Sequence, residues 1–316
     1  MKCTMLDRSL RLGTRGSLLA RTQSGLFSAA FASLSGAKIE EIIIRTEGDD
    51  VSTSLVKPAR PGVFVTALRS ALSRGEVDFI VHSFKDLPSM LEPGITLAAI
   101  PPREDPRDVL VSKAAVSLQD LPAGARVGTS SPRRTARIAF LRPDLVILPM
   151  RGNIDTRIGK VMSGEFDAAV LAAAGLNRVG RNDEIVEYLS LAQLVPAPAQ
   201  GALAVECRSV DTELVMELSE LDDPATRLCT SAERAVLVGI GATCATAIGA
   251  FATFKNGTIT LTAELSDPAT NEHHRVERRL ETVNLDQHQL AEGLGLAVAV
   301  EIRSTPLGQR LSNKDV

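Results

Sequence analysis

The chain has 316 residues, a formal net charge of −3 and a hydrophobic fraction of 44%. This length exceeds the size at which one hydrophobic core keeps growing, so the sequence predicts two or three domains. Tryptophan is absent, tyrosine occurs only at Tyr188, and the sequence pI is about 5.9. This composition disfavours a nucleic-acid-binding protein, which needs stacking aromatics and a basic surface. No apolar stretch approaches the length of a membrane span, and no secretory signal is visible, so we expect a cytoplasmic protein without a membrane partner.

Three pairs of strand-and-turn segments recur in the same order along the first two thirds of the chain. The pairs are 11–17 with 126–132, 39–44 with 145–148, and 75–83 with 164–172. Helix-like segments separate the strands, which is typical of βαβ units with parallel strands. The repetition therefore predicts two similar α/β domains.

Four polar segments directly follow strand-like runs, at 14–17, 82–86, 129–134 and 151–157. Ligands of parallel α/β sheets bind at the carboxyl ends of the strands, so we expect these segments to face one cleft between the two domains. Pro132 favours the first turn of a helix, and the hydroxyl residues before it predict an anion-binding helix N-terminus.

Polar and proline-rich segments divide the chain further. Residues 47–62 are long and polar, which predicts a mobile loop or lid. Residues 101–108 and 195–202 are rich in proline and predict a crossing into the second domain and a crossing back. The expected division is domain 1 at 1–102 with 198–220, domain 2 at 103–197, and domain 3 at 221–316.

The last segment of the chain has a different pattern. Residues 248–254, an Asn256-Gly257 turn and the alternating run 259–265 predict a β-hairpin. A third strand over 273–280 and a helix over 287–303 complete a small α+β domain.

Basic residues are concentrated in the second predicted domain. Between Arg126 and Lys160 there are eight basic residues and two acidic ones. Arginine forks bind carboxylate or phosphate in a bidentate way, and each charge-assisted hydrogen bond contributes roughly 1.5–3 kcal/mol. The cluster predicts a site for a compact small polyanion, and a solvated basic face is the alternative.

Two further residues can carry chemistry. Asp86 follows an apolar strand beside Lys85, where a carboxylate can relay protons or stabilise a cation, although a turn cap is the alternative. His82 ends that strand and is interpreted as structural. Cys244 lies among small residues, either as an accessible thiol or as a buried small hydrophobe. The four cysteines lack metal-ligand spacing, so we expect no metal site.

Seven strings resemble porphobilinogen deaminases, also called hydroxymethylbilane synthases, in order and spacing over almost the whole chain. They are LRLGTRGSLLARTQ, VHSFKDLPSM, GTSSPRRTARI, MRGNIDTRIGK, DAAVLAAAGLNRVG, PAPAQGALAVECR and AERAVL followed by CATAIGA. The resemblance implies two α/β domains like type II periplasmic binding proteins around a cleft, plus a small C-terminal α+β domain. It also implies that four porphobilinogen molecules are condensed with loss of ammonia on a dipyrromethane cofactor, which a thioether holds to Cys244. Hydrolysis then releases hydroxymethylbilane.

The same resemblance implies roles for individual residues. Asp86 is the expected catalytic aspartate, which pairs with pyrrole N–H groups and shuttles protons. Because each pyrrole carries an acetate and a propionate, we expect the cofactor and substrate to contact Arg15, Gln23, Ser83, Lys85, Thr129, Ser130, Ser131, Arg133, Arg134, Arg151, Gly152, Arg157 and Arg178. We expect the protein to be a monomer. The alternative is a non-catalytic carboxylate-binding or pyrrole-binding module.

The chain departs from the family pattern in two places. In the lid, KPARPGVF at 57–64 has Pro61 where the family has a lysine. In the cysteine loop, Ala242, Thr243 and Ala247 stand where the family has Gly, Gly and Pro. We expect Ala242 and Thr243 to adopt negative φ and the loop to remain competent.

Overall fold

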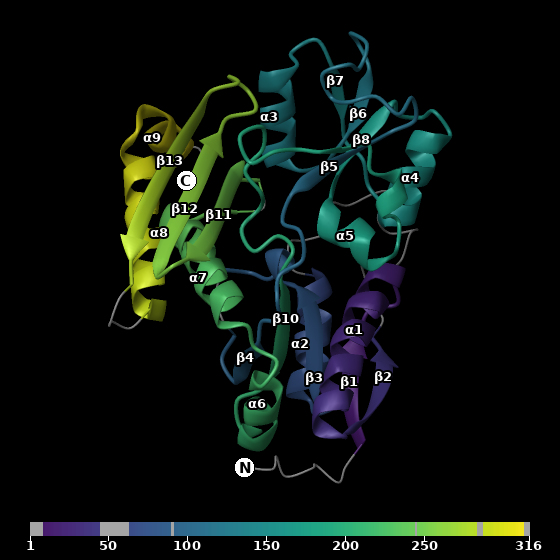
Figure 1. Ribbon diagram of the computed structural model, residues 1–316, viewed down its shortest axis with the longest axis vertical. Coiled ribbons are helices and arrows are strands. Elements are labelled where there is room, and N and C mark those ends of the chain that lie inside the picture. Colours follow the sequence, from purple (N-terminus) through teal and green to yellow (C-terminus); the bar gives the residue numbers. More distant parts are fainter. Residues whose placement is uncertain (1–8, 45–62, 90–91, 244, 283–286, 313–316) are drawn as a thin grey trace. The chain divides into compact units, whose positions relative to one another are not determined.

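The structure is a computed structural model of the chain, and it describes residues 9–44, 63–89, 92–243, 245–282 and 287–312. The chain forms two compact units, one of residues 1–103 with 202–226 and the other of residues 104–201 with 227–316. Figure 1 shows that each sheet is covered by helices. Within the described residues, no helix has both the length and the apolar character needed to cross a membrane.

The first unit contains one five-stranded sheet with the order β2-β1-β3-β10-β4. Its strands are β1 (Ser9–Thr14), β2 (Lys38–Ile43), β3 (Phe79–Ser83), β4 (Ile95–Ala99) and β10 (Leu203–Arg208). Its helices are α1 (Leu18–Ser35), α2 (Val63–Ser73) and α6 (Thr212–Ser219), with a short 3₁₀ helix η2 (Phe84–Asp86) after β3. Buried side chains place α1 and α6 on one face of the sheet and α2 on the other.

Helix α1 begins and ends at residues with strong local preferences. The Ser17 hydroxyl accepts a hydrogen bond from the Ala20 N–H at the N-terminus, and Gly36 ends the helix with a φ of 74°. Between these caps, Phe27 and Phe31 pack against Phe79 of β3, with ring centroids about 6 Å apart. This packing fixes α1 against the strand that leads to Asp86.

The second unit contains a similar five-stranded sheet with the order β7-β6-β8-β5-β9. Its strands are β5 (Asp108–Ser112), β6 (Arg126–Gly128), β7 (Val146–Leu148), β8 (Ala168–Ala172) and β9 (Glu187–Tyr188). Helix α3 (Pro132–Leu141) covers one face, and α4 (Ile154–Met162) and α5 (Ala173–Arg178) cover the other. A 3₁₀ helix η3 (Asn182–Glu184) precedes β9.

Both sheets are mixed, and the parallel strands in each are the ones that the repeated sequence pattern predicted. Strands β1, β2 and β3 are parallel, as are β6, β7 and β8, but β10 and β5 run antiparallel to their neighbours. The parallel pairing predicted for the repeated segments is confirmed, since these segments form β1 to β3 and β6 to β8. Strands β5 and β10 were not part of the repeated pattern, which considered only strands separated by helical segments. These two strands follow the proline-rich segments instead.

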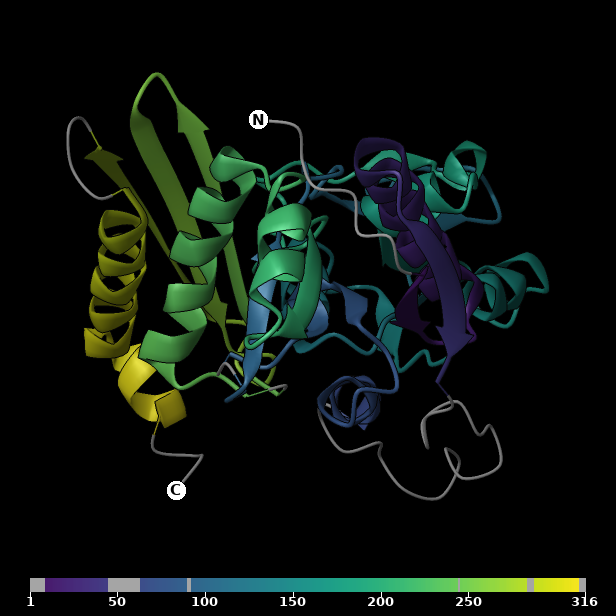
Figure 2. The same ribbon diagram turned by 90° about the horizontal axis from the view of Figure 1, so that it is seen from below.

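The second unit also contains a three-stranded antiparallel sheet with the order β11-β12-β13. Its strands are β11 (Ile248–Lys255), β12 (Thr258–Ser266) and β13 (His273–Glu281), and α7 (Pro224–Ile240), α8 (Gln287–Ser304) and α9 (Pro306–Ser312) accompany them. Asn256 and Gly257 have φ values of 51° and 74°, which a two-residue hairpin turn requires, so the predicted hairpin is confirmed. Figure 2 shows α7 and α8 side by side against this sheet, where they bury its apolar face.

The fold class predicted from the sequence is therefore confirmed as two α/β sheets with a small sheet-rich C-terminal part. The three domain boundaries and the cleft stay predictions.

Candidate functional site

The first group of candidate residues lies where β1 and β3 end. These strands are parallel neighbours, so the residues after Thr14 and the residues from Ser83 onward leave the sheet at the same edge. Gln23, which is buried on α1, makes hydrogen bonds of 3.0 and 3.1 Å with the Ser83 hydroxyl. Ser24 donates a bond of 2.8 Å to the Thr14 hydroxyl. Side-chain contacts thus join α1 to both strand ends.

Asp86 is held in place by the backbone around it. The buried Phe84 donates its N–H to Ala202 O at 3.0 Å, and Leu87 N–H donates to Phe84 O at 3.2 Å. Between these anchors, Asp86 is exposed and Lys85 is half-buried. Arg15, directly after β1, is also half-buried. The exposed carboxylate therefore stands on a fixed turn, where it can contact a ligand.

A buried ionic group supports this turn from within the sheet. Arg69 of α2 holds Glu206 of β10 with bonds of 2.6 and 3.0 Å, and His82 Nε2 lies 3.4 Å from Glu206 Oε2. Burial opposes ionisation of Glu206, but His82 and Arg69 outweigh it and lower the pKa of Glu206 to about 2. The interpretation of His82 as structural agrees with its burial. Arg69 and Glu206 were missed because they are far apart in the sequence.

The second group lies at the N-terminus of α3. Ser131 caps the helix by accepting from Arg134 N–H, and Pro132 occupies the first turn, as the sequence predicted. The Ser130 hydroxyl donates to Met150 O at 2.9 Å and accepts from Met150 N–H at 3.0 Å, and the Thr129 hydroxyl accepts from Ser131 N–H at 3.2 Å. All three hydroxyl residues thus shape the turn itself.

Arg133 and Arg134 share one buried carboxylate. Asp108 is fully buried and accepts bonds of 2.7 to 3.2 Å from both guanidinium groups. Burial opposes ionisation of Asp108, but the charges of the two arginines outweigh it and hold its pKa far below the usual range. The sequence signal for Asp108 was only a single acidic residue at the start of an apolar run.

The arginine pair keeps both positive charge and free donors for a ligand. Arg133 also donates to Val195 O, and Arg134 donates to Val170 O, each through Nη1. Two N–H hydrogens of each guanidinium then have no partner among the described residues. The Asp108 carboxylate and the two guanidinium groups together carry one net positive charge. This charge and the remaining N–H donors fit a ligand that carries several carboxylates.

The segment after β7 adds two further arginines. Gly152 has a φ of 118°, and a Cβ there would meet the Thr156 side chain at 2.7 Å, so this position requires glycine. Arg157 Nε donates to Gly152 O at 2.8 Å, which ties its guanidinium to the turn. Arg151 is exposed.

Arg178 lies at the end of α5. Its Nη2 donates to Gly201 O at 2.6 Å, and burial lowers its pKa to about 10 despite the nearby Glu104. The side chain remains charged at neutral pH. Gly201 also accepts from Glu104 N–H at 3.2 Å, so Arg178 contacts the segment where the chain leaves the second sheet.

The cysteine loop is described on both sides of Cys244, which itself lies outside the described residues, as does Pro61 of the predicted lid. Thr243 N–H donates to the Thr246 hydroxyl at 2.9 Å. Ala242 and Thr243 both lie outside the positive-φ region, as expected from the sequence, so neither replacement of glycine strains the backbone.

Comparison with known proteins gives matches over most of the chain. Residues 10–216 match the family domain described as "Porphobilinogen deaminase, dipyromethane cofactor binding domain", and residues 227–304 match "Porphobilinogen deaminase, C-terminal domain". The chain is 53% identical over 252 residues to porphobilinogen deaminase 1 of Streptomyces coelicolor, covering 78% of this chain and 79% of that one. It is 51% identical over 243 residues to porphobilinogen deaminase of Mycobacterium tuberculosis, covering 77% and 78%.

Two solved structures are also similar to this chain. Substrate-binding domain 2 of Lactococcus lactis GlnP in its open conformation has a TM-score of 0.43 and 12% identity, covering 76% of this chain and 94% of that one. An ancestral cationic amino acid solute-binding protein has a TM-score of 0.41 and 18% identity, covering 67% and 87%.

Proposed function

This chain belongs to the porphobilinogen deaminase family, which is a family of transferases. We infer that the residues after β1 and β3 in the first sheet, and those after β6 and β7 in the second, carry out the family's reaction. The enzyme condenses four porphobilinogen molecules head to tail with loss of ammonia, and hydrolysis then releases hydroxymethylbilane. The observation that carries this proposal is the family match, which covers both sheet edges and the C-terminal part that contains Cys244.

The arginines and hydroxyl residues bind the carboxylates of the cofactor and substrate. Arg133 and Arg134 would hold the cofactor, because each keeps N–H donors after binding Asp108. Arg151 and Arg157 lie on the next segment of the same sheet, and Arg157 is fixed by Gly152. Since Arg133, Arg134 and Arg157 are held before a ligand arrives, little conformational entropy of these three side chains is lost on binding.

Asp86 acts on the reacting pyrrole. Loss of ammonia from porphobilinogen leaves a positive charge on the substrate, and an exposed carboxylate on a fixed turn can stabilise that charge. The same oxygens can accept a pyrrole N–H or carry a proton. Lys85 and Arg15 leave the same edge of the sheet and would hold substrate carboxylates.

Cys244 is the proposed attachment residue for the dipyrromethane, through a thioether. When bound, this cofactor supplies the terminal pyrrole carbon to which the first substrate is joined. We place the enzyme in the cytoplasm, where thiols are kept reduced and Cys244 stays available for thioether formation. We also propose that it acts as a monomer.

Intact-protein mass spectrometry tests the proposal. The purified wild-type protein should carry a covalent adduct of two pyrrole units, and Cys244→Ala should lack it. Cys229→Ala is the matched control, because Cys229 is buried in the same unit and should leave the adduct in place. A wild-type mass equal to the bare chain after incubation with porphobilinogen would contradict the proposal and favour a non-catalytic binding module.

A further inference from the structure

Glu233 is a fully buried acidic residue in the middle of α7. Both oxygens of its side chain accept hydrogen bonds from the main chain. Glu233 Oε2 accepts from Ala199 N–H at 2.6 Å, and Oε1 accepts from Ala252 N–H at 2.8 Å. Ala199 lies in the segment between β9 and β10, and Ala252 lies in β11. One side chain therefore joins three separate segments of the second unit.

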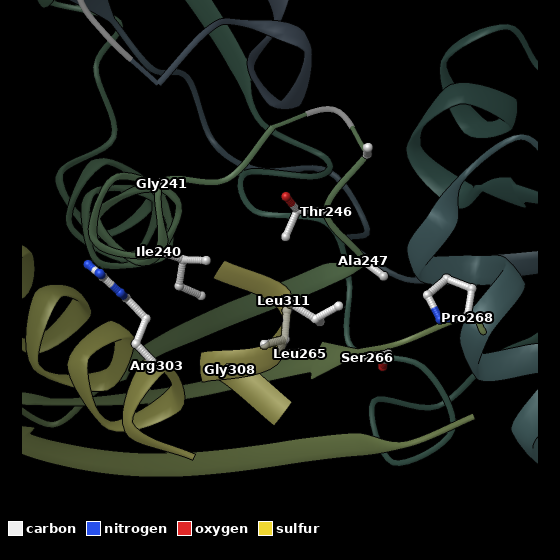
Figure 3. Close-up of a pocket in the computed structure, with 11 residues that line it drawn as sticks. Ile240, Gly241, Thr246, Ala247, Leu265, Ser266, Pro268, Arg303, Gly308 and Leu311 are labelled. Atoms are coloured by element: carbon white, nitrogen blue, oxygen red, sulfur yellow. The ribbon is translucent and has the colours of Figure 1, made fainter. Parts of the chain in front are cut away.

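The bond to Ala252 joins the two elements on either side of the cysteine loop. Helix α7 ends directly before residues 241–247, and β11 begins directly after them. Figure 3 shows Gly241 and Thr246 on the two sides of this loop. Because Glu233 belongs to α7 and Ala252 to β11, their bond holds together the two ends from which the loop emerges.

The other oxygen of Glu233 holds a residue in an unfavourable backbone conformation. Ala199 is fully buried and has a φ of 60°. This left-handed conformation is disfavoured for a residue with a Cβ, so it persists only where the surrounding structure imposes it. The bond from Ala199 N–H to Glu233 and a bond of 2.9 Å from Gln200 N–H to Ala197 O impose it here. Glu233 thus helps to set the direction of the chain after Ala199.

The next residue, Gln200, connects this turn to the arginine pair. Its buried side chain donates from Nε2 to Pro106 O at 2.7 Å and to Asp108 Oδ1 at 3.1 Å. The same Asp108 oxygen accepts from Arg134 Nε at 2.9 Å. The contacts therefore run from Glu233 through one turn and one side-chain amide to the carboxylate that holds the arginine pair.

Further contacts hold the same segment against β11 and against the arginine pair. Ala250 N–H of β11 donates to Pro196 O at 3.0 Å, and Arg133 Nη1 donates to Val195 O at 2.7 Å. A Cβ at Gly249 would lie 2.6 Å from Val195 O, so β11 and the segment are in direct contact. A shift of this segment would disturb both β11 and Arg133.

We propose that Glu233 is a positioning residue for cofactor attachment. A cofactor bound to Cys244 has to place its carboxylates on the arginine pair, and this costs less entropy when the loop and the pair are already fixed. Glu233 fixes both, because one oxygen holds β11 and the other holds the turn that presents Gln200 to Asp108. This role rests on the proposed function of Cys244 and the arginines, whereas the contacts themselves do not.

Glu233→Gln tests the proposal in the full-length protein. A carboxylate accepts on both oxygens, whereas the glutamine amide presents an NH₂ group to one of the two N–H donors. The control is Val298→Ala, which lowers stability by a cavity in the core that α7 shares and leaves the contacts of Glu233 in place. Each protein is produced in cells that make no porphobilinogen, and intact mass follows the adduct after porphobilinogen is added. We expect Glu233→Gln to acquire the adduct about tenfold more slowly than the wild type and the control.

A spectroscopic signal separates positioning from general stability. The ¹⁵N resonance of Arg134 Nε reports on its hydrogen bond to Asp108. We expect this resonance to shift in folded Glu233→Gln and to keep its wild-type position in Val298→Ala. Gln200→Met removes the connecting amide at similar size and should reproduce both the slower attachment and the shift. This second variant decides the question if Glu233→Gln does not fold.

Two outcomes would overturn the proposal. One is attachment in Glu233→Gln at the rate of Val298→Ala with an unshifted Arg134 resonance, which would mean that Glu233 only stabilises the fold. The other is an unshifted resonance and normal attachment in Gln200→Met. If the wild type itself acquires no adduct, the proposed function fails, and the resonance still decides whether Glu233 positions the arginine pair.

Discussion

Arg137 of α3 and Glu264 of β12 form a buried ion pair, with 3.1 Å between Nε and Oε1. Glu264 also accepts a bond of 2.7 Å from Arg275 of β13, so one carboxylate joins α3 to the three-stranded sheet. Burial lowers the pKa of Arg137 although Glu264 opposes the shift, and Arg137 Nη1 has no hydrogen-bond partner among the described residues. Helix α3 carries Arg133 and Arg134, and this contact holds it against the part of the chain that contains Cys244.

The first prediction concerns this carboxylate. Glu264→Gln leaves Arg137 buried without a counter-charge, and breaking a buried pair costs about 3–5 kcal/mol. Glu301→Gln is the control, because it removes only an exposed pair with Arg278, for which about 0–1 kcal/mol is expected. Urea unfolding followed by circular dichroism measures both. Equal stability of the two variants would show that the buried pair does not hold α3.

A second prediction concerns stability at low pH. The pKa of Glu206 is about 2 in the folded protein, below the ordinary value of roughly 4.3, so the folded state binds its proton less tightly than the unfolded state. Its contribution, on the order of 3 kcal/mol, is fully present above the unfolded value and is lost as pH falls towards 2. We expect the free energy of unfolding to fall less steeply between pH 5 and 2 in Glu206→Gln than in the wild type. Parallel pH profiles of the two proteins would contradict this assignment.

Asp86→Asn should preserve the turn, because the backbone bonds of Phe84 and Leu87 hold it and the amide is nearly isosteric. Removal of the negative charge should lower the rate of porphobilinogen consumption by about 10²-fold or more. The assay follows pyrrole consumption, and circular dichroism confirms folding. Asp183→Asn changes an exposed carboxylate on the 3₁₀ helix η3 of the second unit and is the control. Wild-type turnover by folded Asp86→Asn would mean that Asp86 only caps a turn.

The arginines should differ in their effects. Arg133→Leu leaves Asp108 with one cation fewer and removes the free donors of Arg133, so we expect loss of the covalent adduct together with lower stability. Arg157→Leu removes a half-buried side chain that bonds Gly152 O on its own turn, so it should keep stability and adduct but stall elongation. Intact mass after brief exposure to porphobilinogen distinguishes the two, because stalled intermediates add further pyrrole units. Normal loading and elongation in both variants would refute the anion-site hypothesis.

Local features of the site were predictable from the sequence. The Ser131 cap before Pro132, the Asn256-Gly257 turn and the non-positive φ of Ala242 and Thr243 depend on backbone preferences of adjacent residues, which the order of residues alone determines. The short apolar runs likewise predicted the strand ends that precede the candidate site residues.

The partners of these local features were decided by the tertiary structure. Asp108 binds Arg133 and Arg134 because β5 runs antiparallel beside β8, and Glu206 reaches Arg69 because β10 enters the first sheet between β3 and β4. Strand order and direction depend on the packing of segments far apart in the chain, and residue patterns contain no signal for them. The sequence alone therefore determined which side chains can bind carboxylates, and the packing decided which of them are buried, paired and held in place.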